Sequence, residues 1–373
     1  MEQRNAQAPM PRVQTVNGPV DPAELGRVLS HEHLLSLTPG PWLSGGRRGG
    51  GDGGDGADGS PGSAGSAGSA EEQAAAFDRE QVELAVAALS GLAAYGVDTV
   101  VDLSPYGDAG RDAWGANTAL LQEVSRRSGV HIVAGTTTYR EAFSPAWVRA
   151  AGVEEITRRF VEDAQVGFGG TTVRAGILGE VPTGLGEITA HERKGLRAAA
   201  RAHHLTGLAV STHTTHGTMA LEQVDLLEEE EVDPGRVVIG HMDNHPDLDY
   251  LRRVLDRGVN IAFDSVGKQN WDLRLPPVTD AQPDGPYPRQ SLRQSDTTRA
   301  DRIARLVAEG HAGRILLSHD LTGLQVHQNP ATHGQWGYTY LSAVFLPMLA
   351  ERGVTEGQID AMMRANPVRL LTV

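Results

Sequence analysis

Two histidines, His31 and His33, stand one residue apart at the end of an apolar run, in the segment VLSHEHLLSL from Val28 to Leu37. Side chains alternate along an extended strand, so both imidazoles would point to the same side and could bind one metal ion. The chain contains 14 histidines among 373 residues, a content at which an isolated His-X-His pair also arises by chance. The pair has chemical meaning only if other ligand-type residues reach the same place.

Four further residues of ligand type stand at the ends of other apolar runs. They close the segments VRAGILGEV, LAVSTHT, VVIGHMD and ILLSHD, and they are Glu180, His213, His241 and Asp320. Four imidazoles and two carboxylates are too many for one catalytic zinc ion, which takes three protein ligands and a water, but they suit two neighbouring ions. His319 competes with Asp320 as a ligand, although alternation along a strand should point these neighbours in opposite directions.

The runs that carry these residues belong to a regular alternation of strand-like and helix-like segments. Between the runs lie patterns such as VEEITRRFVEDAQ and DLDYLRRVLDRG, in which apolar residues recur at helical spacing. Eight such units predict a (β/α)8 TIM barrel, with an open, doubly wound sheet as the alternative. In a TIM barrel the active site lies at the C-terminal ends of the strands. The eight predicted strands are Arg27–Ser30, Asp98–Leu103, His131–Thr136, Val173–Leu178, Leu208–Thr212, Arg236–Gly240, Val259–Phe263 and Arg314–Ser318.

Composition narrows the class of protein and of metal ligand. The formal net charge of −14 argues against nucleic acid and anionic membrane surfaces as partners. The sequence contains no cysteine, so a metal ion would have histidine and carboxylate ligands. No apolar stretch approaches the length of a membrane span, and the sequence predicts a soluble, cytoplasmic protein.

We expect a single (β/α)8 domain over residues 1–373, interrupted by a low-complexity insert at residues 45–70. The insert, GGRRGGGDGGDGADGSPGSAGSAGSA, cannot bury an apolar core and is predicted to be a flexible loop. Its role is either that of a spacer or that of a mobile lid over a site.

Several motifs together carry a resemblance to the phosphotriesterase family of the amidohydrolase superfamily, from about Val28 to Pro367. They are SHEHL, GVDTVVDLSPYGDAGRD, HIVAGTTTY, RAGILGEV, STHT, IGHMD, FDSVG, LLSHD and ANPVRLL. The resemblance implies a binuclear centre of two divalent ions, with Zn²⁺ favoured and Mn²⁺, Co²⁺ or Fe²⁺ as alternatives. It also implies a homodimer that acts on a small-molecule substrate.

Carried over residue by residue, the resemblance assigns a role to each ligand-type side chain. It implies that one ion is held by the HxH pair and Asp320, and the other by the two histidines of the later strands, His213 and His241. Glu180 would bridge the ions. Asp320 would also act as the catalytic residue that takes a proton from the attacking, metal-bridging hydroxide.

Departures from the family pattern point toward a substrate class. Organophosphate-hydrolysing members bridge the metals with a carbamylated lysine, but the only lysines here are Lys194 and Lys268, and neither lies near the fourth predicted strand. Glu180 therefore resembles the bridge of the glutamate-bridged branch. Ser265 stands where organophosphatases have a histidine, and Leu-Thr-Gly follows Asp320 where sugar-phosphate lactonases place an arginine.

We therefore expect a metal-dependent hydrolase of a carboxylic ester or lactone. Alternatives are phosphotriesterase (aryldialkylphosphatase) activity, amide hydrolysis and a non-catalytic ligand-binding member of the family. A mononuclear deaminase or amidohydrolase of the wider superfamily is a further alternative, in which Glu180 would bind no metal.

Other residues near the predicted strand ends are candidate substrate contacts. We assign this role to Tyr106, Arg111, Tyr139, Asp264 and Lys268. The proline-rich loop from residue 268 to 298 is expected to wall the pocket, with Trp271, Trp336 and Tyr338 as lining or packing residues. His216 and His245 are interpreted as loop residues rather than ligands.

Overall fold

The computed structural model describes residues 10–35, 70–107, 110–268, 273–274, 292–328 and 337–373. The predicted insert lies outside the described residues except for Ala70, which begins the first long helix. Trp271, Trp336 and most of the predicted wall loop also lie outside them. A two-stranded pair, β10 (Leu273–Arg274) and β11 (Leu292–Arg293), is described within that loop.

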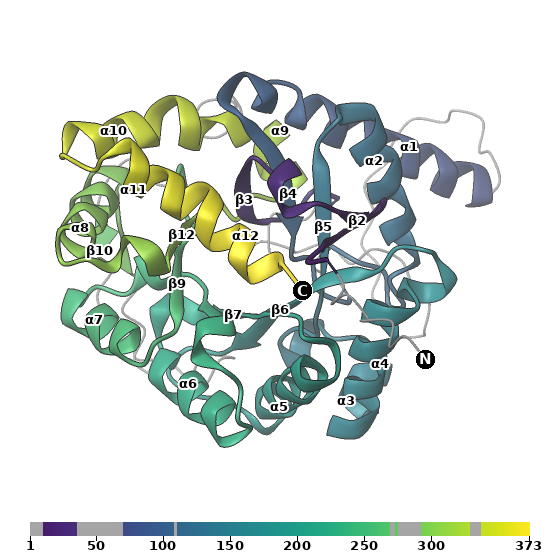
Figure 1. The fold of residues 1–373 in the computed structure, drawn as a ribbon. Coiled ribbons are helices and arrows are strands. Elements are labelled where there is room, and N and C mark those ends of the chain that lie inside the picture. Colours follow the sequence, from purple (N-terminus) through teal and green to yellow (C-terminus); the bar gives the residue numbers. More distant parts are fainter. Residues whose placement is uncertain (1–9, 36–69, 108–109, 269–272, 275–291, 329–336) are drawn as a thin grey trace, which may run out of the picture.

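Eight parallel strands form the central ring of the molecule (Figure 1). All eight correspond to predicted strands, and β5 has the predicted limits. The strands are β3 (Arg27–Glu32), β4 (Val97–Asp102), β5 (His131–Thr136), β6 (Ala175–Thr183), β7 (Val210–Thr214), β8 (Val237–Ile239), β9 (Asn260–Phe263) and β12 (Ile315–Leu317).

The ring closes between its first and last strands, β3 and β12. The N–H of Asp320 donates to the carbonyl of His31 (3.0 Å), and the N–H of His33 donates to the carbonyl of Leu321 (3.0 Å). His33 also forms a parallel bridge with Thr322. The architecture is therefore the predicted TIM barrel, and the doubly wound alternative is wrong.

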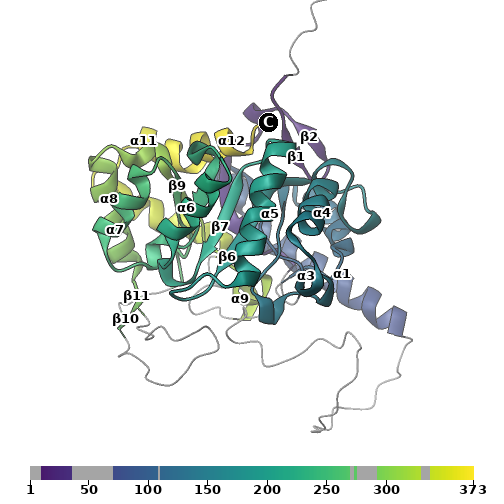
Figure 2. The ribbon, with the colours of Figure 1, turned by 90° about the horizontal axis from the view of Figure 1, so that it is seen from below.

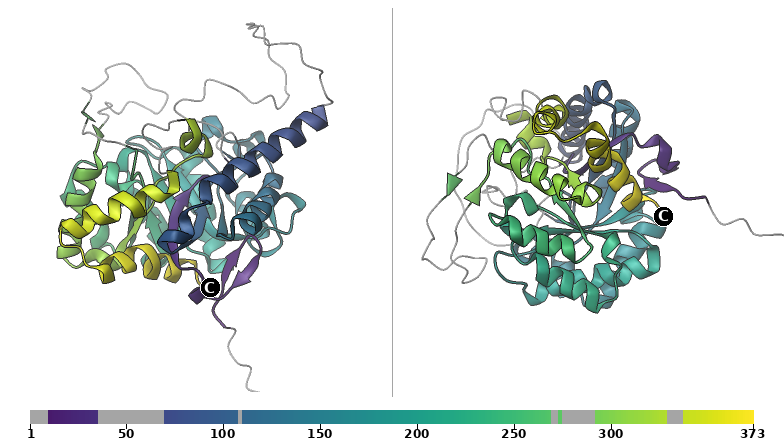
Figure 3. Two further views of the ribbon diagram at one scale, coloured as in Figure 1. Left: turned by 90° about the horizontal axis from the view of Figure 1, so that it is seen from above. Right: turned by 60° about the vertical axis from the view of Figure 1, so that its left-hand side comes forward.

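Helices surround the ring, and each strand is followed by at least one (Figure 3). Their apolar stripes face the strands: in α7, Leu251, Val254 and Leu255 are buried at helical spacing, whereas Asp249 is exposed. The helices are α1 (Ala70–Leu89), α2 (Ala119–Ser128), α3 (Ala146–Ala150), α4 (Val153–Gln165), α5 (Ala190–Thr206), α6 (Ala220–Glu229), α7 (Leu248–Asp256), α8 (Asp296–Ala308), α9 (Gly323–Gln328), α10 (Leu346–Glu351), α11 (Glu356–Asp360) and α12 (Asn366–Leu371).

The N-terminal end of the barrel is covered by the two ends of the chain (Figure 2). An antiparallel hairpin of β1 (Val13–Thr15) and β2 (Gly18–Val20) lies beside α12. Arg12 and Val373 exchange backbone hydrogen bonds of 2.9 and 3.0 Å. This hairpin was not predicted from the sequence, although Asn17-Gly18 is a turn signal.

Within the described part of the chain, no helix combines the length and the apolar character needed to cross a membrane.

Candidate metal centre

The six ligand-type side chains predicted from the sequence gather at the C-terminal end of the barrel. His31 lies in β3 and His33 one residue past its end, Glu180 lies in β6 and His213 in β7, and the other two, His241 and Asp320, follow β8 and β12 by two and three residues. Two groups have ligand atoms close enough together to hold a metal ion: His31, His33 and Asp320, and His31, Glu180 and His241. The two groups share His31, and His213 belongs to neither, although its Nδ1 lies 2.8 Å from Oε2 of Glu180.

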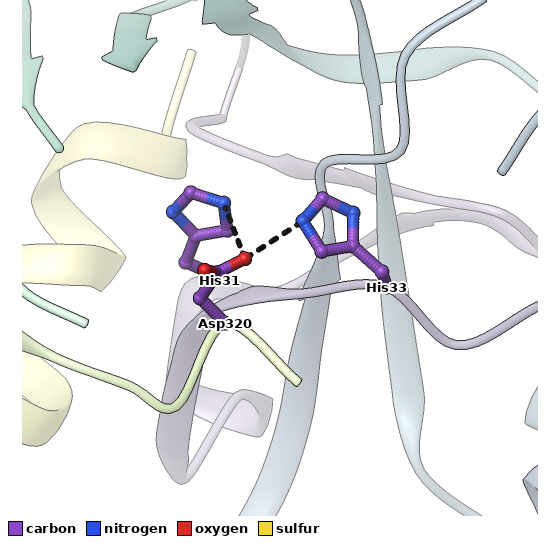
Figure 4. Close-up of side chains that lie close together, drawn as sticks. All are labelled: His31, His33 and Asp320. Atoms are coloured by element: carbon purple, nitrogen blue, oxygen red, sulfur yellow. Dashed lines mark hydrogen bonds and ion pairs between the residues drawn. The ribbon is translucent and has the colours of Figure 1, made fainter. Parts of the chain in front are cut away.

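The first group joins the two strands that close the barrel (Figure 4). The carboxylate of Asp320 lies between two imidazoles, 3.0 Å from Nε2 of His33 and 3.7 Å from Nε2 of His31. A backbone φ of 53° at Asp320 aims the side chain into the site. Lys268 forms an ion pair with the other carboxylate oxygen of Asp320.

Glu180 is the centre of the arrangement, because its carboxylate approaches all four imidazoles. Its Oε2 lies 2.8 Å from Nδ1 of His213, 3.2 Å from Nε2 of His31 and 3.3 Å from Nε2 of His241. Its Oε1 lies 3.6 Å from Nε2 of His33. A carboxylate placed among all four imidazoles fits a residue shared by two adjacent ions.

The backbone of β6 brings Glu180 to that position. The strand continues to Thr183, beyond the predicted end at Leu178, so Glu180 lies within the strand rather than after it. Pairing with β7 shifts register between Leu178 and Val181, and such irregularities re-aim side chains. At Gly179 a Cβ atom would stand 2.5 Å from the carbonyl oxygen of Ser211, so only glycine permits this close approach.

In three of the four imidazoles, a contact to Nδ1, on the side of the ring away from Glu180, fixes the orientation of the ring. Nδ1 of His31 and Nδ1 of His241 each lie 2.9 Å from a different oxygen of Asp264. Nδ1 of His33 lies 3.3 Å from Oγ of Ser104. Each ring therefore turns its Nε2 toward Glu180, an arrangement typical of histidines that bind metals through Nε2.

The donor set fits divalent ions. Nε2 of His31 is buried without a well-formed hydrogen bond among the described residues, although it lies 3.2 Å from Oε2 of Glu180 and 3.7 Å from Oδ1 of Asp320. Neutral imidazoles and carboxylates are the ligands that zinc prefers when cysteine is absent. A cation at this point would give the buried nitrogen and Glu180 a common partner.

The electrostatics of the cluster show how strongly its groups interact. Burial alone would lower the pKa of His31, yet the charges of Glu180 and Asp264 raise it to about 10. Burial lowers the pKa of His213. Burial alone would raise the pKa of Glu180, but His213 and His31 hold it well below its usual range. The carboxylates thus attract positive charge to this site.

The predicted substrate contacts fall into two sets. Lys268 and Tyr139 lie at the centre: Lys268 touches Asp320, and the ring of Tyr139 packs edge-on against His213 at 5.5 Å between centroids. Asp264 is fully buried and turns both oxygens to histidines, so its geometry favours an orienting role over substrate contact.

The second set consists of Tyr106 and Arg111, whose polar groups bind other buried groups of the protein. The hydroxyl of Tyr106 hydrogen-bonds to Asp163 at 2.5 Å. The guanidinium of Arg111 donates to backbone carbonyls of Ser104 and Gly135 and contacts the carboxylate of Asp102. Both side chains are buried, which leaves them little capacity to contact a substrate.

The histidines interpreted as non-ligands stay outside the two candidate groups. His245 stacks on Tyr250 with 4.1 Å between ring centroids. His216 belongs to neither group of potential ligands. His319 turns away from the centre, as alternation predicts, and its Nδ1 lies 2.8 Å from Oε1 of Glu32.

Sequence reasoning missed two residues that support the site. Ser104 contacts His33, and Glu32, the central residue of the HEH motif, binds the segment that carries Asp320. Alternation offered a signal for Glu32, because a residue between two inward histidines must face the opposite side of the strand.

Known proteins resemble this chain over most of its length. It is 34% identical over 253 residues to the phosphotriesterase homology protein of Escherichia coli, covering 68% of this chain and 78% of that protein. It is 29% identical to N-acetyltaurine hydrolase of Rattus norvegicus over 97% of this chain and 98% of that protein. A crystal structure of a PTE-like lactonase mutant from Deinococcus radiodurans has a TM-score of 0.72 and 28% identity, covering 96% of this chain and 99% of that chain.

The model of the phosphotriesterase family matches residues 11–371. This range includes both strands that close the barrel and all six side chains of the candidate centre. The chain belongs to the phosphotriesterase family.

Proposed function

We propose that the protein is a binuclear metal-dependent hydrolase of a carboxylic ester or lactone. His31, His33 and Asp320 hold one ion, His213 and His241 hold the other, and Glu180 bridges them. The observation that carries the proposal is the position of Glu180 within 3.6 Å of a ring nitrogen of each of the four imidazoles. When bound, two divalent ions lower the pKa of water toward 7 and polarise the oxygen of the scissile group. Zinc is the favoured metal.

Asp320 is the catalytic residue that receives the proton of the attacking water. Burial opposes ionisation, but Lys268 and then His33 hold the pKa of this carboxyl well below its usual range. It is therefore ionised near neutral pH, the form that general base catalysis requires. Its side chain is 21% exposed, so the proton can pass on to solvent.

Lys268 has the position and charge to contact the substrate as well as Asp320. Its side chain is 19% exposed and carries the ammonium into the mouth of the site. Tyr139 forms an apolar wall beside His213. These two residues, with Asp264 behind the histidines, are the predicted contacts that the geometry leaves in or next to the site.

Three features support the ester or lactone as substrate. Glu180, not a lysine, stands where the resemblance places the bridge, Ser265 follows Asp264 in place of a histidine, and Leu321 follows Asp320 in a segment without arginine. The similarity to the PTE-like lactonase of Deinococcus radiodurans points the same way. A phosphotriester is the less favoured substrate.

An amide is the second candidate substrate. The relative from Rattus norvegicus, an N-acetyltaurine hydrolase, matches 97% of this chain. The same pair of ions and the same proton acceptor would serve an amide carbonyl, which differs from an ester in its poorer leaving group.

A substrate panel tests these alternatives. Zinc-loaded protein is assayed with a γ-lactone, a chromogenic carboxylic ester, an N-acyl amide and a dialkyl aryl phosphate, with and without prior removal of metal. We expect the highest kcat/KM with the lactone or ester and loss of turnover after metal removal. Turnover that survives complete metal removal would contradict the proposal, and a preference for the amide would select the second candidate.

A further inference from the structure

Glu32 lies between the two histidines of the HEH motif but faces the other side of β3. Its side chain is fully buried, and it contacts the segment that follows β12 instead of the metal centre. A buried carboxylate is costly unless it accepts hydrogen bonds from every side. The identity of its donors therefore indicates what this residue does.

Four hydrogen-bond donors converge on Glu32, all from residues 318–321. Oε1 accepts from Oγ of Ser318 (2.8 Å), the N–H of His319 (3.0 Å) and Nδ1 of His319 (2.8 Å). Oε2 accepts from the N–H of Leu321 (2.9 Å). Glu32 thus holds the backbone N–H groups of the two residues on either side of Asp320.

Neighbouring hydrogen bonds fix the direction of these contacts. Nε2 of His319 accepts from the N–H of Leu341 (3.1 Å), so Nδ1 carries the proton and donates to Glu32. Oγ of Ser318 accepts from the N–H of His31 (3.0 Å), so its hydroxyl is directed to Glu32. Each contact therefore needs an acceptor at position 32, which a carboxylate provides at both oxygens.

Asp320 needs such support because of its backbone conformation. Its φ of 53° lies in the left-handed region, which a residue other than glycine occupies only when its surroundings hold it there. The N–H groups before and after it bind Glu32, and its own N–H binds the carbonyl of His31. The same conformation places its carboxylate 3.0 Å from Nε2 of His33.

We propose that Glu32 is the positioning residue of Asp320: by clamping the peptides on both sides, it keeps the Asp320 carboxylate at the metal site. This inference rests on the proposed function. It assigns the central residue of HEH a role in the chemistry, exerted through hydrogen bonds from the outer side of the strand.

The test compares the variant E32Q with the wild-type protein and with D163N. In E32Q one acceptor oxygen becomes an NH₂ group that faces an N–H donor. Asp163 is also fully buried and hydrogen-bonded, but it contacts none of the six centre residues among its described hydrogen bonds, which makes D163N the matched control. We measure Co²⁺ affinity by titration, metal content after dialysis, melting temperature, and kcat and KM with the chromogenic ester.

Loss of a residue that orients a metal ligand typically costs about 10- to 100-fold in metal affinity or activity. We expect E32Q to bind one of its two ions about 10- to 100-fold more weakly and to lose kcat on the same scale, with KM close to that of the wild type. D163N should lose melting temperature alone.

The outcomes separate this inference from the proposed function. A wild type that binds no divalent ion would overturn both. A wild type with two ions, together with an E32Q protein that retains them, keeps kcat within twofold and only melts earlier, would overturn the positioning role alone.

If E32Q does not fold, E32D replaces it, since the shorter side chain keeps the charge but withdraws its two oxygens from the four donors. A several-fold loss of kcat and Co²⁺ affinity would support the positioning role. Unchanged values would contradict it.

Discussion

The two halves of the candidate centre differ in their exposure to solvent. In the half built from β6, β7 and the end of β8, the side chains of Glu180, His241 and His213 are 3%, 6% and 10% exposed. The half built from β3 and the end of β12 opens at Asp320, which is 21% exposed and lies beside Lys268. On the proposed function, the enclosed half would retain its ion and the open half would exchange protons and substrate.

The halves also differ in how they are assembled. Glu180, His213 and His241 come from three consecutive strands, whereas His31 and Asp320 come from the first and last strands of the ring. The open half therefore exists only once β3 and β12 have paired. Residues that hold β3 against the segment after β12, such as Glu32, should therefore affect the open half more than the enclosed half.

The largest effect is expected from E180A, which removes the group common to both halves. Both ions should be lost, and kcat should fall by at least roughly 10³-fold, the upper end of what loss of one preorganised group costs. Metal content and turnover check this result. E187A, a partly exposed position in the loop that follows β6, should retain both ions, and retention of both ions by E180A would contradict the shared role.

D320N should separate the two halves. The amide no longer accepts a proton, so kcat should fall by roughly 10²-fold, the scale of general base catalysis. The enclosed half should still hold its ion, giving at least one metal per chain. Loss of both ions from D320N would show that the halves do not bind metal separately.

D264N should weaken both halves moderately, because Asp264 orients His31 of one half and His241 of the other. Metal affinity should fall by about 10- to 100-fold, as for other residues that orient ligands. Isothermal titration with zinc measures the change, with D360N at the exposed Asp360–Arg364 pair as control. A loss confined to one ion would place Asp264 in one half only.

Metal binding should release protons, the smallest of the expected effects. With the pKa of His31 raised to about 10 and that of His241 raised well above its usual value, both imidazoles are protonated near pH 7, yet binding requires them neutral. Zinc titration of metal-free protein in weak buffer should release about one to two protons per chain, and affinity should rise with pH. Binding without proton release would contradict these protonation states.

The sequence predicted the features that depend on residue type and local spacing. The apolar runs identified all eight strands, and the polar residues at their ends identified the side chains that the structure brings together. The family resemblance then assigned these residues to a binuclear metal centre.

Features that depend on distant packing were missed. Tyr106 and Arg111 follow a strand end, yet each turns to buried partners on other elements. The continuation of β6 through Glu180 arises from its pairing with β7. The role of Glu32 depends on donors nearly 290 positions away in the chain, which no local pattern indicates.

Metal content per chain, measured by elemental mass spectrometry on wild-type protein after zinc loading and dialysis, tests the central claim most directly. The account predicts close to two ions per chain. A single ion would favour a mononuclear enzyme and contradict the bridging role of Glu180, and a protein that takes up none would contradict the metal centre altogether.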